Sequence, residues 1–489
     1  PAVNIILPTV NTPSVSSLAF SPTGNGDSSW IAKNSIRLSY VGNPASYSIG
    51  DVAPIAQMNL NGGTMNVAVS GVNFDLSLSN TTASGVWGSA HTVDTSPGVQ
   101  NFSWTGLGTA GVTYTQVAIM KLVGGHDIYV DNLEINFSGT GVSPENPKIL
   151  FHIDAHNDYG SSVFHVGSDV NTNITGSNLM YFGIQYHGSG ALTTDAGLIQ
   201  NGTVTTSSTG SNNTIFGTQE DSLGTKQRNL YFTNNGTITL NGSNERLGLI
   251  DITSNAGFGG VFTNSGIVNI NGTDSYGVVV SSRATVGLPK IILNKPLNIN
   301  GSNNIGIGIL REFDTSQSLI KLNLNGADSF GIVADYAKTT TSTFNNYELA
   351  TGAASNNDVL VILKNGDLTF DNTGKTTTMA GINNFGFVAG SGTNLILDNN
   401  LSSTGDKNLP LVSDSSTVQY AGTITTNGLE SHGLVVKGTG TLTNISGKTV
   451  SSIVNGDGSV ALYNEGTVNL NDGGVFKSLG NGGAAVFSV

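Results

Sequence analysis

The chain has 489 residues, of which 10% are charged, against roughly 25% in ordinary soluble domains. Its 19 basic and 32 acidic residues give a formal net charge of −13. A negative surface without Lys/Arg clusters argues against binding to nucleic acid. Glycine supplies 65 residues, and 37% of the chain is hydrophobic. With Ser, Thr, Asn and Val abundant, this composition argues against disorder and against a mainly helical enzyme, and it predicts an all-β protein.

Cysteine is absent, which excludes disulfides, zinc–thiolate sites and cysteine nucleophiles. The sequence has no run of 18 apolar residues that could form a membrane-spanning helix. It opens without the basic and apolar pattern of a signal peptide, and it stops at Val489 within a patterned stretch. We therefore expect the chain to be a fragment of a longer protein.

The first 130 residues differ from the rest and are predicted to form an irregular, β-rich N-terminal cap. They hold 7 of the 12 prolines and all three tryptophans. Trp87 and Trp104 stand among Gly, Ser and Thr rather than in apolar runs. Each is therefore a candidate for stacking on a sugar ring or anchoring a protein interface. The alternative is that these indoles close the small core of the cap.

Residues 131–489 repeat one pattern, in which an alternating apolar run ends in Asn-Gly and a short polar stretch leads to a second apolar run. The clearest copies are TITLNGSNERLG (237–248), IVNINGTDSYG (267–277), LNINGSNNIG (297–306) and LNLNGADSFG (322–331). Their Asn-Gly pairs begin at Asn241, Asn271, Asn300 and Asn325, in steps of 30, 29 and 25 residues. Such a step predicts one coil of a β-solenoid per repeat, because hairpins recur about every 8–12 residues.

Three polar segments interrupt the period, near 187–229, 337–358 and 402–417, and all are rich in Gly, Ser and Thr. On a solenoid such segments are expected as loops inserted on the outside of a coil. They are either tolerated surface length or recognition loops.

One dense cluster of polar side chains occurs at FHIDAHNDY, residues 151–159. If this segment is a strand, Phe151 and Ile153 face the core. The opposite face then presents His152, Asp154, His156 and Asp158. Such a row can bind sugar hydroxyls or a metal ion, or it can be a solvated face whose charges neutralise each other. We take the four residues as a candidate ligand site and assign no metal ligand and no cofactor.

Catalytic motifs are missing, since the sequence has no G-x-S-x-G elbow, P-loop, H-E-x-x-H or EF-hand loop. Glycoside hydrolysis would need two carboxyl groups about 5–10 Å apart. Asp154 with Asp158, or Asp127 with Asp131, are the candidate pairs. Their spacing is that of ordinary surface acids, so we expect no enzymatic activity.

The repeats resemble those of a known protein family in composition and style. Segments such as NNGTITLNGSNERLGL, NSGIVNINGTDSYGVVV and NEGTVNLND are similar to the passengers of type V autotransporters, above all to the large outer-membrane adhesins of fusobacteria. The resemblance covers roughly residues 131–489 and includes no catalytic or binding motif. It implies a right-handed parallel β-helix displayed on the bacterial cell surface, with a role in virulence. The family's own translocator barrel in the outer membrane is absent from this chain.

Three hypotheses follow for the function. The leading one is a surface adhesin fragment that binds a host glycan, an immune or epithelial receptor, or other bacteria. The second is a passive stalk that presents another binding region. The third is a polysaccharide-degrading β-helix, which the shortage of basic residues and of a recognisable acid–base pair makes weakest. The irregular, Trp-bearing N-terminal region favours the adhesin over the stalk.

Overall fold

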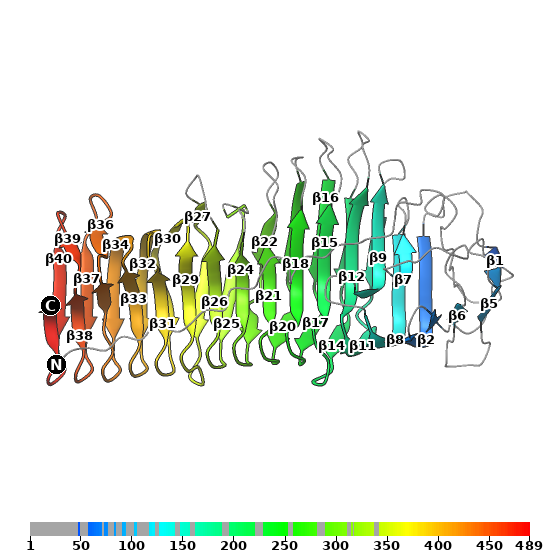
Figure 1. Ribbon diagram of the computed structural model, residues 1–489, viewed down its shortest axis with the longest axis horizontal. Helices are drawn as coiled ribbons and strands as arrows, with labels where there is room; N and C mark the ends of the chain where they lie inside the picture. The colour runs from blue at the N-terminus through cyan, green and yellow to red at the C-terminus, as the bar shows by residue number, and fades with distance from the viewer. Residues whose placement is uncertain are drawn as a thin grey trace. The chain divides into compact units, whose positions relative to one another are not determined.

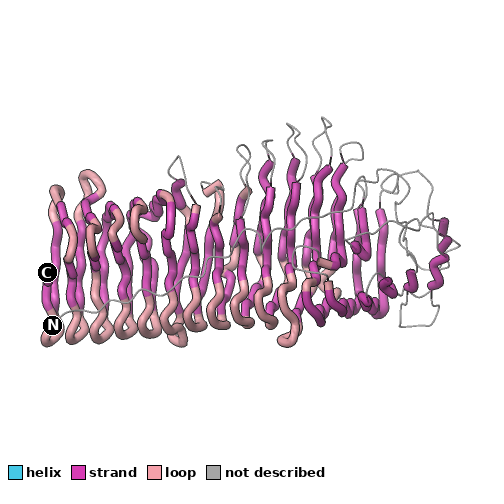
Figure 2. Tube along the Cα trace, viewed as in Figure 1, coloured by secondary structure: helices cyan, strands magenta, loops and turns pink. Residues whose placement is uncertain are grey.

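A computed structural model shows an all-β protein whose parallel strands stack as a β-solenoid, which confirms the predicted fold class. The described part of the chain contains strands and turns and no helix (Figure 2). It comprises residues 47–48, 57–70, 73–76, 83–84, 90–93, 102–104, 117–122, 127–141, 147–156, 162–187, 195–220, 228–252, 258–280, 289–310, 314–315, 317–336 and 342–489.

The chain forms two compact units. Among the described residues, the first unit ends at Lys295 and the second begins at Pro296.

The first unit builds each coil from three successive strands. In one coil the chain passes through β16 (Arg228–Asn234), β17 (Thr237–Leu240) and β18 (Arg246–Ile252). The next coil repeats this with β19 (Phe258–Asn264), β20 (Ile267–Ile270) and β21 (Tyr276–Val280). Each strand pairs in parallel with its counterpart one coil later. The other strands of this stack are β7 (Val117–Leu122), β8 (Asp127–Thr140), β9 (Lys148–His156), β10 (Ser162–Val166), β11 (Asn171–Ser177), β12 (Leu179–His187), β13 (Asp195–Gln200), β14 (Thr203–Thr206), β15 (Thr214–Glu220) and β22 (Lys290–Leu293).

The first unit also holds the strands of the predicted cap. Strand β2 (Gln57–Ser70) pairs in parallel with β8, so parallel stacking reaches back to residue 57. Antiparallel pairs join β2 to β3, β3 to β6, β4 to β5 and β5 to β6. These strands are β1 (Tyr47–Ser48), β3 (Asn73–Leu76), β4 (Ala83–Ser84), β5 (Ala90–Val93) and β6 (Phe102–Trp104).

The second unit repeats the same coil, and its strands stand side by side in Figure 1. One parallel sheet runs through β24 (Ile305–Ile309), β26 (Phe330–Asp335), β29 (Val359–Asn365), β31 (Phe385–Ala389), β33 (Leu409–Asp414), β35 (Leu434–Lys437), β38 (Val460–Asn464) and β41 (Ala484–Ser488). The remaining strands of this unit are β23 (Leu297–Ile299), β25 (Ile320–Leu324), β27 (Ser342–Phe344), β28 (Tyr347–Thr351), β30 (Asp367–Met379), β32 (Asn394–Ser403), β34 (Thr417–Thr426), β36 (Thr441–Asn444), β37 (Val450–Val454), β39 (Thr467–Asn469) and β40 (Gly474–Ser478).

The core lies inside the coils and is made by alternate strand residues. In β17 and β25 every second residue is buried, including Ile238, Leu240, Leu322 and Leu324, as expected of strands with one solvated face. The first unit adds a row of stacked rings. Its ring centroids lie 5.9 Å apart for Phe182–Phe216, 5.1 Å for Phe216–Phe232 and 5.6 Å for Phe232–Phe262.

The Asn-Gly pairs of successive coils stack on one another, and the glycine permits their close approach. The amide of Asn271 donates to Asn241 Oδ1 at 3.0 Å, one coil away. Gly272 keeps a negative φ, but a Cβ there would overlap the carbonyl oxygen of Gly242. The residues in the left-handed conformation are later ones, such as Asn244 and Asp274, with φ of 53° and 55°. Glycine therefore serves close stacking, and Asn or Asp serves the tight turn.

The three segments predicted as loop insertions contain strands. Segment 187–229 includes all of β13, β14 and β15, and segment 337–358 includes β27 and β28. Segment 402–417 includes β33 and lies entirely within the described chain. Strand β14 shows why a polar segment can form a strand. Val204 and Thr206 are buried, and the alternating Thr203 and Thr205 are half-buried. Threonine suits strands, so polar composition did not indicate a loop here.

Candidate functional site

The predicted His/Asp row begins on β9, a strand of the first unit. His152, Asp154 and His156 belong to this strand, and the neighbouring Phe151 and Ile153 are fully buried, as expected. Asp158 and Trp87 lie outside the described residues. Trp104 is the last residue of β6, where Phe74 of β3 is its antiparallel partner.

Parallel pairing places other polar residues beside this row. Asp154 is in register with Gln185 of β12, Gln185 with Gln219 of β15, and Gln219 with Asp251 of β18. We call these four residues the polar column. Adjacent members are separated by one strand spacing, about 4.8 Å. The four residues therefore occupy one register row of a single parallel sheet, two of them aspartates and two glutamines.

Two further register pairs flank the polar column on β9. His156 is in register with His187, the last residue of β12, and His152 is in register with Lys121 of β7. Imidazole, amide and carboxyl groups can together donate to and accept from hydroxyl groups. Sequence reasoning found the β9 members of this array. It missed Gln185, Gln219 and Asp251, because the register between coils cannot be read from one repeat.

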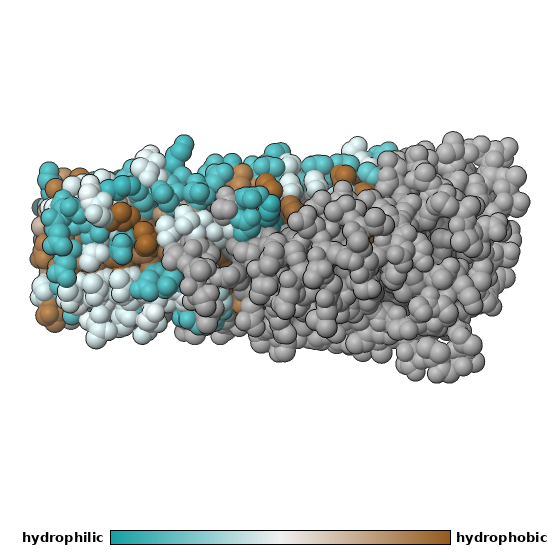
Figure 3. All heavy atoms as spheres, turned by 90° about the horizontal axis from the view of Figure 1, so that it is seen from above, coloured by the Kyte–Doolittle hydropathy of each residue, from teal (hydrophilic) through white to brown (hydrophobic). Residues whose placement is uncertain are grey.

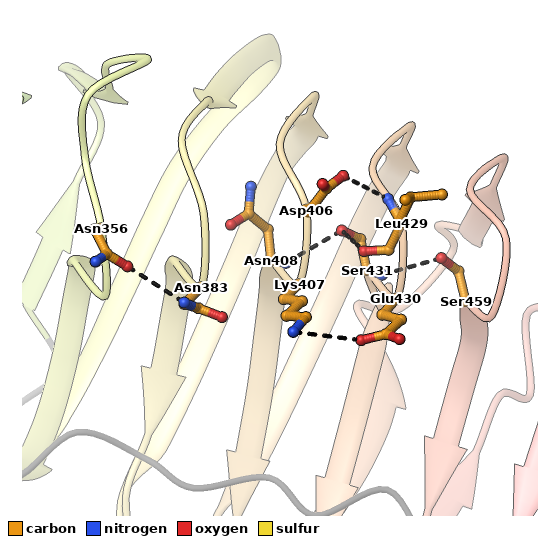
Figure 4. Close-up of polar contacts among 9 residues, drawn as sticks. All are labelled: Asn356, Asn383, Asp406, Lys407, Asn408, Leu429, Glu430, Ser431 and Ser459. Carbon is orange, nitrogen blue, oxygen red and sulfur yellow. Dashed lines mark hydrogen bonds and ion pairs between the residues drawn. The ribbon is translucent and has the colours of Figure 1, made fainter.

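Inside the second unit, a chain of buried polar residues links consecutive coils. The residue after each left-handed turn position uses its side-chain oxygen to accept a backbone N–H from the coil before it. Figure 4 shows two steps, Asn408 N to Ser431 Oγ at 3.1 Å and Ser431 N to Ser459 Oγ at 3.0 Å. The members are Asn304, Ser329, Asp358, Asn384, Asn408, Ser431 and Ser459, each at 2% exposure or less. We call this set the buried ladder.

Asp358 is the acidic member of the buried ladder. Its Oδ1 accepts the Ser329 N–H at 2.8 Å, and its own N–H donates to Asn384 Oδ1 at 2.9 Å. Its Oδ2 is buried and has no hydrogen-bond partner. Burial raises the pKa of this carboxyl from 3.8 to about 7, against the lowering effect of the Ser329 N–H and with a smaller raising effect from the charge of Asp328. A neutral carboxyl group is thus favoured at this position.

Glu245 occupies the equivalent turn position in the first unit, with a different environment. It is fully buried, and its Oε2 accepts from Thr206 Oγ1 at 2.5 Å and from Gly242 N at 2.9 Å. Its Oε1 accepts from Asn213 Nδ2 at 2.9 Å. Burial raises the pKa of this carboxyl, while these three donors lower it. Both Glu245 and Asp358 are 0% exposed, so a polymeric substrate cannot reach either carboxyl group.

A surface ion pair ties two coils of the second unit together. The ammonium of Lys448 contacts the nearly buried carboxyl of Asp398, which also accepts from Thr373 Oγ1 at 2.9 Å. Asp371 is the register partner of Asp398 on the adjacent coil, and Thr373 Oγ1 lies 3.0 Å from it. The bond to Asp398 raises the pKa of Lys448. A lysine in this charged state neutralises an acidic corner, so we interpret the cluster as structural.

His432 of the second unit has a structural role. Its Nδ1 accepts the backbone N–H of Val460 at 3.0 Å, which requires the neutral ring with its proton on Nε2. Burial lowers its pKa.

Within the described residues, no group of three or more His, Asp or Glu side chains could hold a metal ion. No helix in that part of the chain is long and apolar enough to cross a membrane. Searches of protein-family models, curated proteins and solved structures found no match to this chain.

Proposed function

We propose that this chain is part of a bacterial surface adhesin, an autotransporter passenger that binds a host cell-surface glycan or receptor by contact alone. The observation that supports this most is the polar column of Asp154, Gln185, Gln219 and Asp251 on a β-solenoid sheet. Aspartate and glutamine at successive register positions of one sheet are residue types that suit repeated hydrogen bonding to hydroxyl-bearing ligands. The resemblance of the repeats to autotransporter passengers supports the cell-surface location.

Binding without chemistry is favoured over polysaccharide cleavage. Asp358 and Glu245, the two carboxyl groups whose pKa is raised by burial, are enclosed within the coils. A glycosidase needs a pair of acids that both reach the sugar. The acids of the described surface cluster, Asp371 and Asp398, are occupied by Thr373 and Lys448.

The regularity of the second unit favours the passive stalk as the other candidate. From residue 342 to 489 its coils follow one another with a continuous buried ladder and short turns. Such a stack resists bending because each coil is bonded to the next. A stalk would need only this property.

Binding to cells, with and without sugar competitors, tests the proposal. The fluorescently labelled chain would be added to epithelial and lymphoid cells, with or without excess galactose and N-acetylgalactosamine. Competition by either sugar would indicate a lectin-type adhesin, and binding that ignores both would indicate a protein receptor. Absence of binding to every cell type would reject the adhesin and leave the stalk.

Variants locate the site. Asp154→Asn combined with Gln185→Ala and Asp251→Asn is expected to reduce binding at least tenfold without changing the melting temperature. Trp87→Ala and Trp104→Ala test the tryptophan alternative in the same assay. Gln419→Ala with Asp457→Asn, which alters the second unit at similar chemistry, is the matched control and should leave binding unchanged.

A further inference from the structure

Asn-Gly pairs recur along the second unit, and most of them are bonded from coil to coil. Five such pairs occur within residues 296–456. The Nδ2 of Asn325 donates to Asn300 Oδ1 at 3.1 Å, and the Nδ2 of Asn455 donates to Asn427 Oδ1 at 2.6 Å. We call these four residues the stacked asparagines. The side chain of each is held by an asparagine in another coil.

The fifth pair, Asn365 and Gly366, lacks such bonds. Asn365 is the last residue of β29, and its side chain is exposed. Within the described chain, this side chain has no hydrogen-bond partner, and the Gly366 N–H has no acceptor. Both reacting groups of an Asn-Gly pair are therefore unbonded at this position.

The backbone around this pair is irregular and faces water. The pairing between β26 and β29 shifts register where Asp335 meets Asn365. Gly366 has a φ of 92°, a conformation that glycine adopts without strain. Strand β29 runs upward in Figure 1, and Figure 3 views the molecule from that side, where hydrophilic residues cover much of the described surface.

An Asn-Gly pair can deamidate without an enzyme. The backbone nitrogen of the glycine attacks Cγ of the asparagine, and a new C–N bond closes a succinimide ring. The bond from Cγ to the side-chain nitrogen breaks, and that nitrogen leaves as ammonia together with the proton from the glycine nitrogen. Water then opens the ring at either carbonyl to give aspartate or isoaspartate. Because both groups belong to one chain, the rate depends on how freely Cγ can approach the nitrogen.

We propose that Asn365 is a site of spontaneous deamidation, whereas the stacked asparagines are protected. A stacked asparagine must release its partner in the other coil before its Cγ can approach the glycine nitrogen. Its glycine is also closely packed, since a Cβ added at Gly456 would lie 1.8 Å from a carbonyl oxygen of the adjacent coil. Exposure does not make the difference, because Asn427 and Asn455 are exposed as Asn365 is. The inference is independent of the proposed adhesin function.

The product changes the charge between two strands. Asp335 is the register partner of Asn365, and its Oδ2 lies 3.5 Å from Lys364 Nζ. A carboxylate at position 365 would place like charges on adjacent strands, which is destabilising. Amide hydrogens of β26 and β29 should therefore exchange faster in the deamidated chain than in the fresh chain.

Peptide mapping by mass spectrometry tests the inference on the 489-residue chain, incubated at mildly alkaline pH with and without guanidinium chloride. The unfolded chain is the reference, because every Asn-Gly pair is then free. In the folded chain we expect Asn365 to deamidate at close to its rate in the unfolded chain. The stacked asparagines should deamidate roughly tenfold or more below their unfolded rates, because each needs a local opening of the coil first.

Two variants test the cause of the difference. Asn365→Gln should lose the fast conversion, because the longer side chain must close a larger ring. Asn427→Ala removes the acceptor of Asn455, so it should speed deamidation of Asn455 roughly threefold or more and leave Asn365 unchanged. Circular dichroism of both variants verifies that the fold is intact. Protection of Asn365 equal to that of the stacked asparagines, or an unchanged rate at Asn455 in the Asn427→Ala variant, would overturn the inference.

Discussion

Replacement of Asp358 by asparagine should remove the loss of unfolding free energy that the second unit undergoes as the pH rises and this carboxyl ionises. The variant keeps the oxygen that accepts the Ser329 N–H and replaces the unpartnered, buried Oδ2 by an amide group. Its ladder neighbours on either side, Ser329 and Asn384, are already neutral. The substitution therefore changes ionisation with little change in shape.

The size of the effect follows from the pKa of this carboxyl, which is raised from 3.8 to about 7. Because one pKa unit is about 1.4 kcal/mol, the shift corresponds to roughly 4 kcal/mol as an order of magnitude. A raised pKa means that the folded chain holds the proton more tightly than the unfolded chain. This group's contribution to the free energy of unfolding is therefore greatest below pH 4 and falls as the pH rises from about 4 to about 7.

Urea unfolding at pH 4.5 and pH 8.5, followed by hydrogen exchange of segment 356–363, would measure the effect. We expect Asp358→Asn to be close to the unaltered chain at the lower pH and more stable by up to about 4 kcal/mol at the higher pH. Asp457→Asn, which changes an exposed turn acid in a later coil, should show no such difference between the two pH values. An equal effect of Asp358→Asn at both pH values would refute the reasoning.

Two other predictions concern the stacking of coils. Gly272→Ala should cost at least 2 kcal/mol of unfolding free energy, because the added Cβ would overlap the Gly242 carbonyl oxygen. At Gly374 φ is +77°, but a Cβ added there would have no atom within 4 Å, so Gly374→Ala should cost only about 1 kcal/mol of unfolding free energy. Equal urea midpoints for the Gly272→Ala and Gly374→Ala variants would contradict this account. His432 has a lowered pKa, so its contribution to stability is present above about pH 6.5 and is lost as the pH falls. The Val460 amide should then lose protection from hydrogen exchange between pH 7 and pH 5, after correction for intrinsic rates, and unchanged protection would exclude the proposed acceptor role of Nδ1.

The solenoid could be predicted because its repeat is visible in the sequence. The steps between Asn241, Asn271, Asn300 and Asn325 mark successive coils, and the side-chain amides of Asn271 and Asn325 each bond to the asparagine one coil earlier. The buried ladder was not predicted, although a signal exists. One polar residue stands directly before each second apolar run, as Ser329 does before Phe330 and Asp358 before Val359.

The polar column lay beyond sequence reasoning for a physical reason. Asp154, Gln185, Gln219 and Asp251 are 31, 34 and 32 residues apart, so no fixed period aligns them. The segments between the strands vary in length, and only backbone pairing sets the register. The threonine-rich segment that contains β14 has the polar composition of a loop, but its alternation of half-buried and buried residues is that of a strand.

Saturable binding of the labelled 489-residue chain to epithelial and lymphoid cells tests the central claim most directly. Flow cytometry over a range of concentrations should give a plateau that excess unlabelled chain abolishes and that heat-unfolded chain does not reproduce. Signal that rises linearly with concentration, or that the unfolded chain reproduces, would contradict the claim that the folded solenoid is an adhesin.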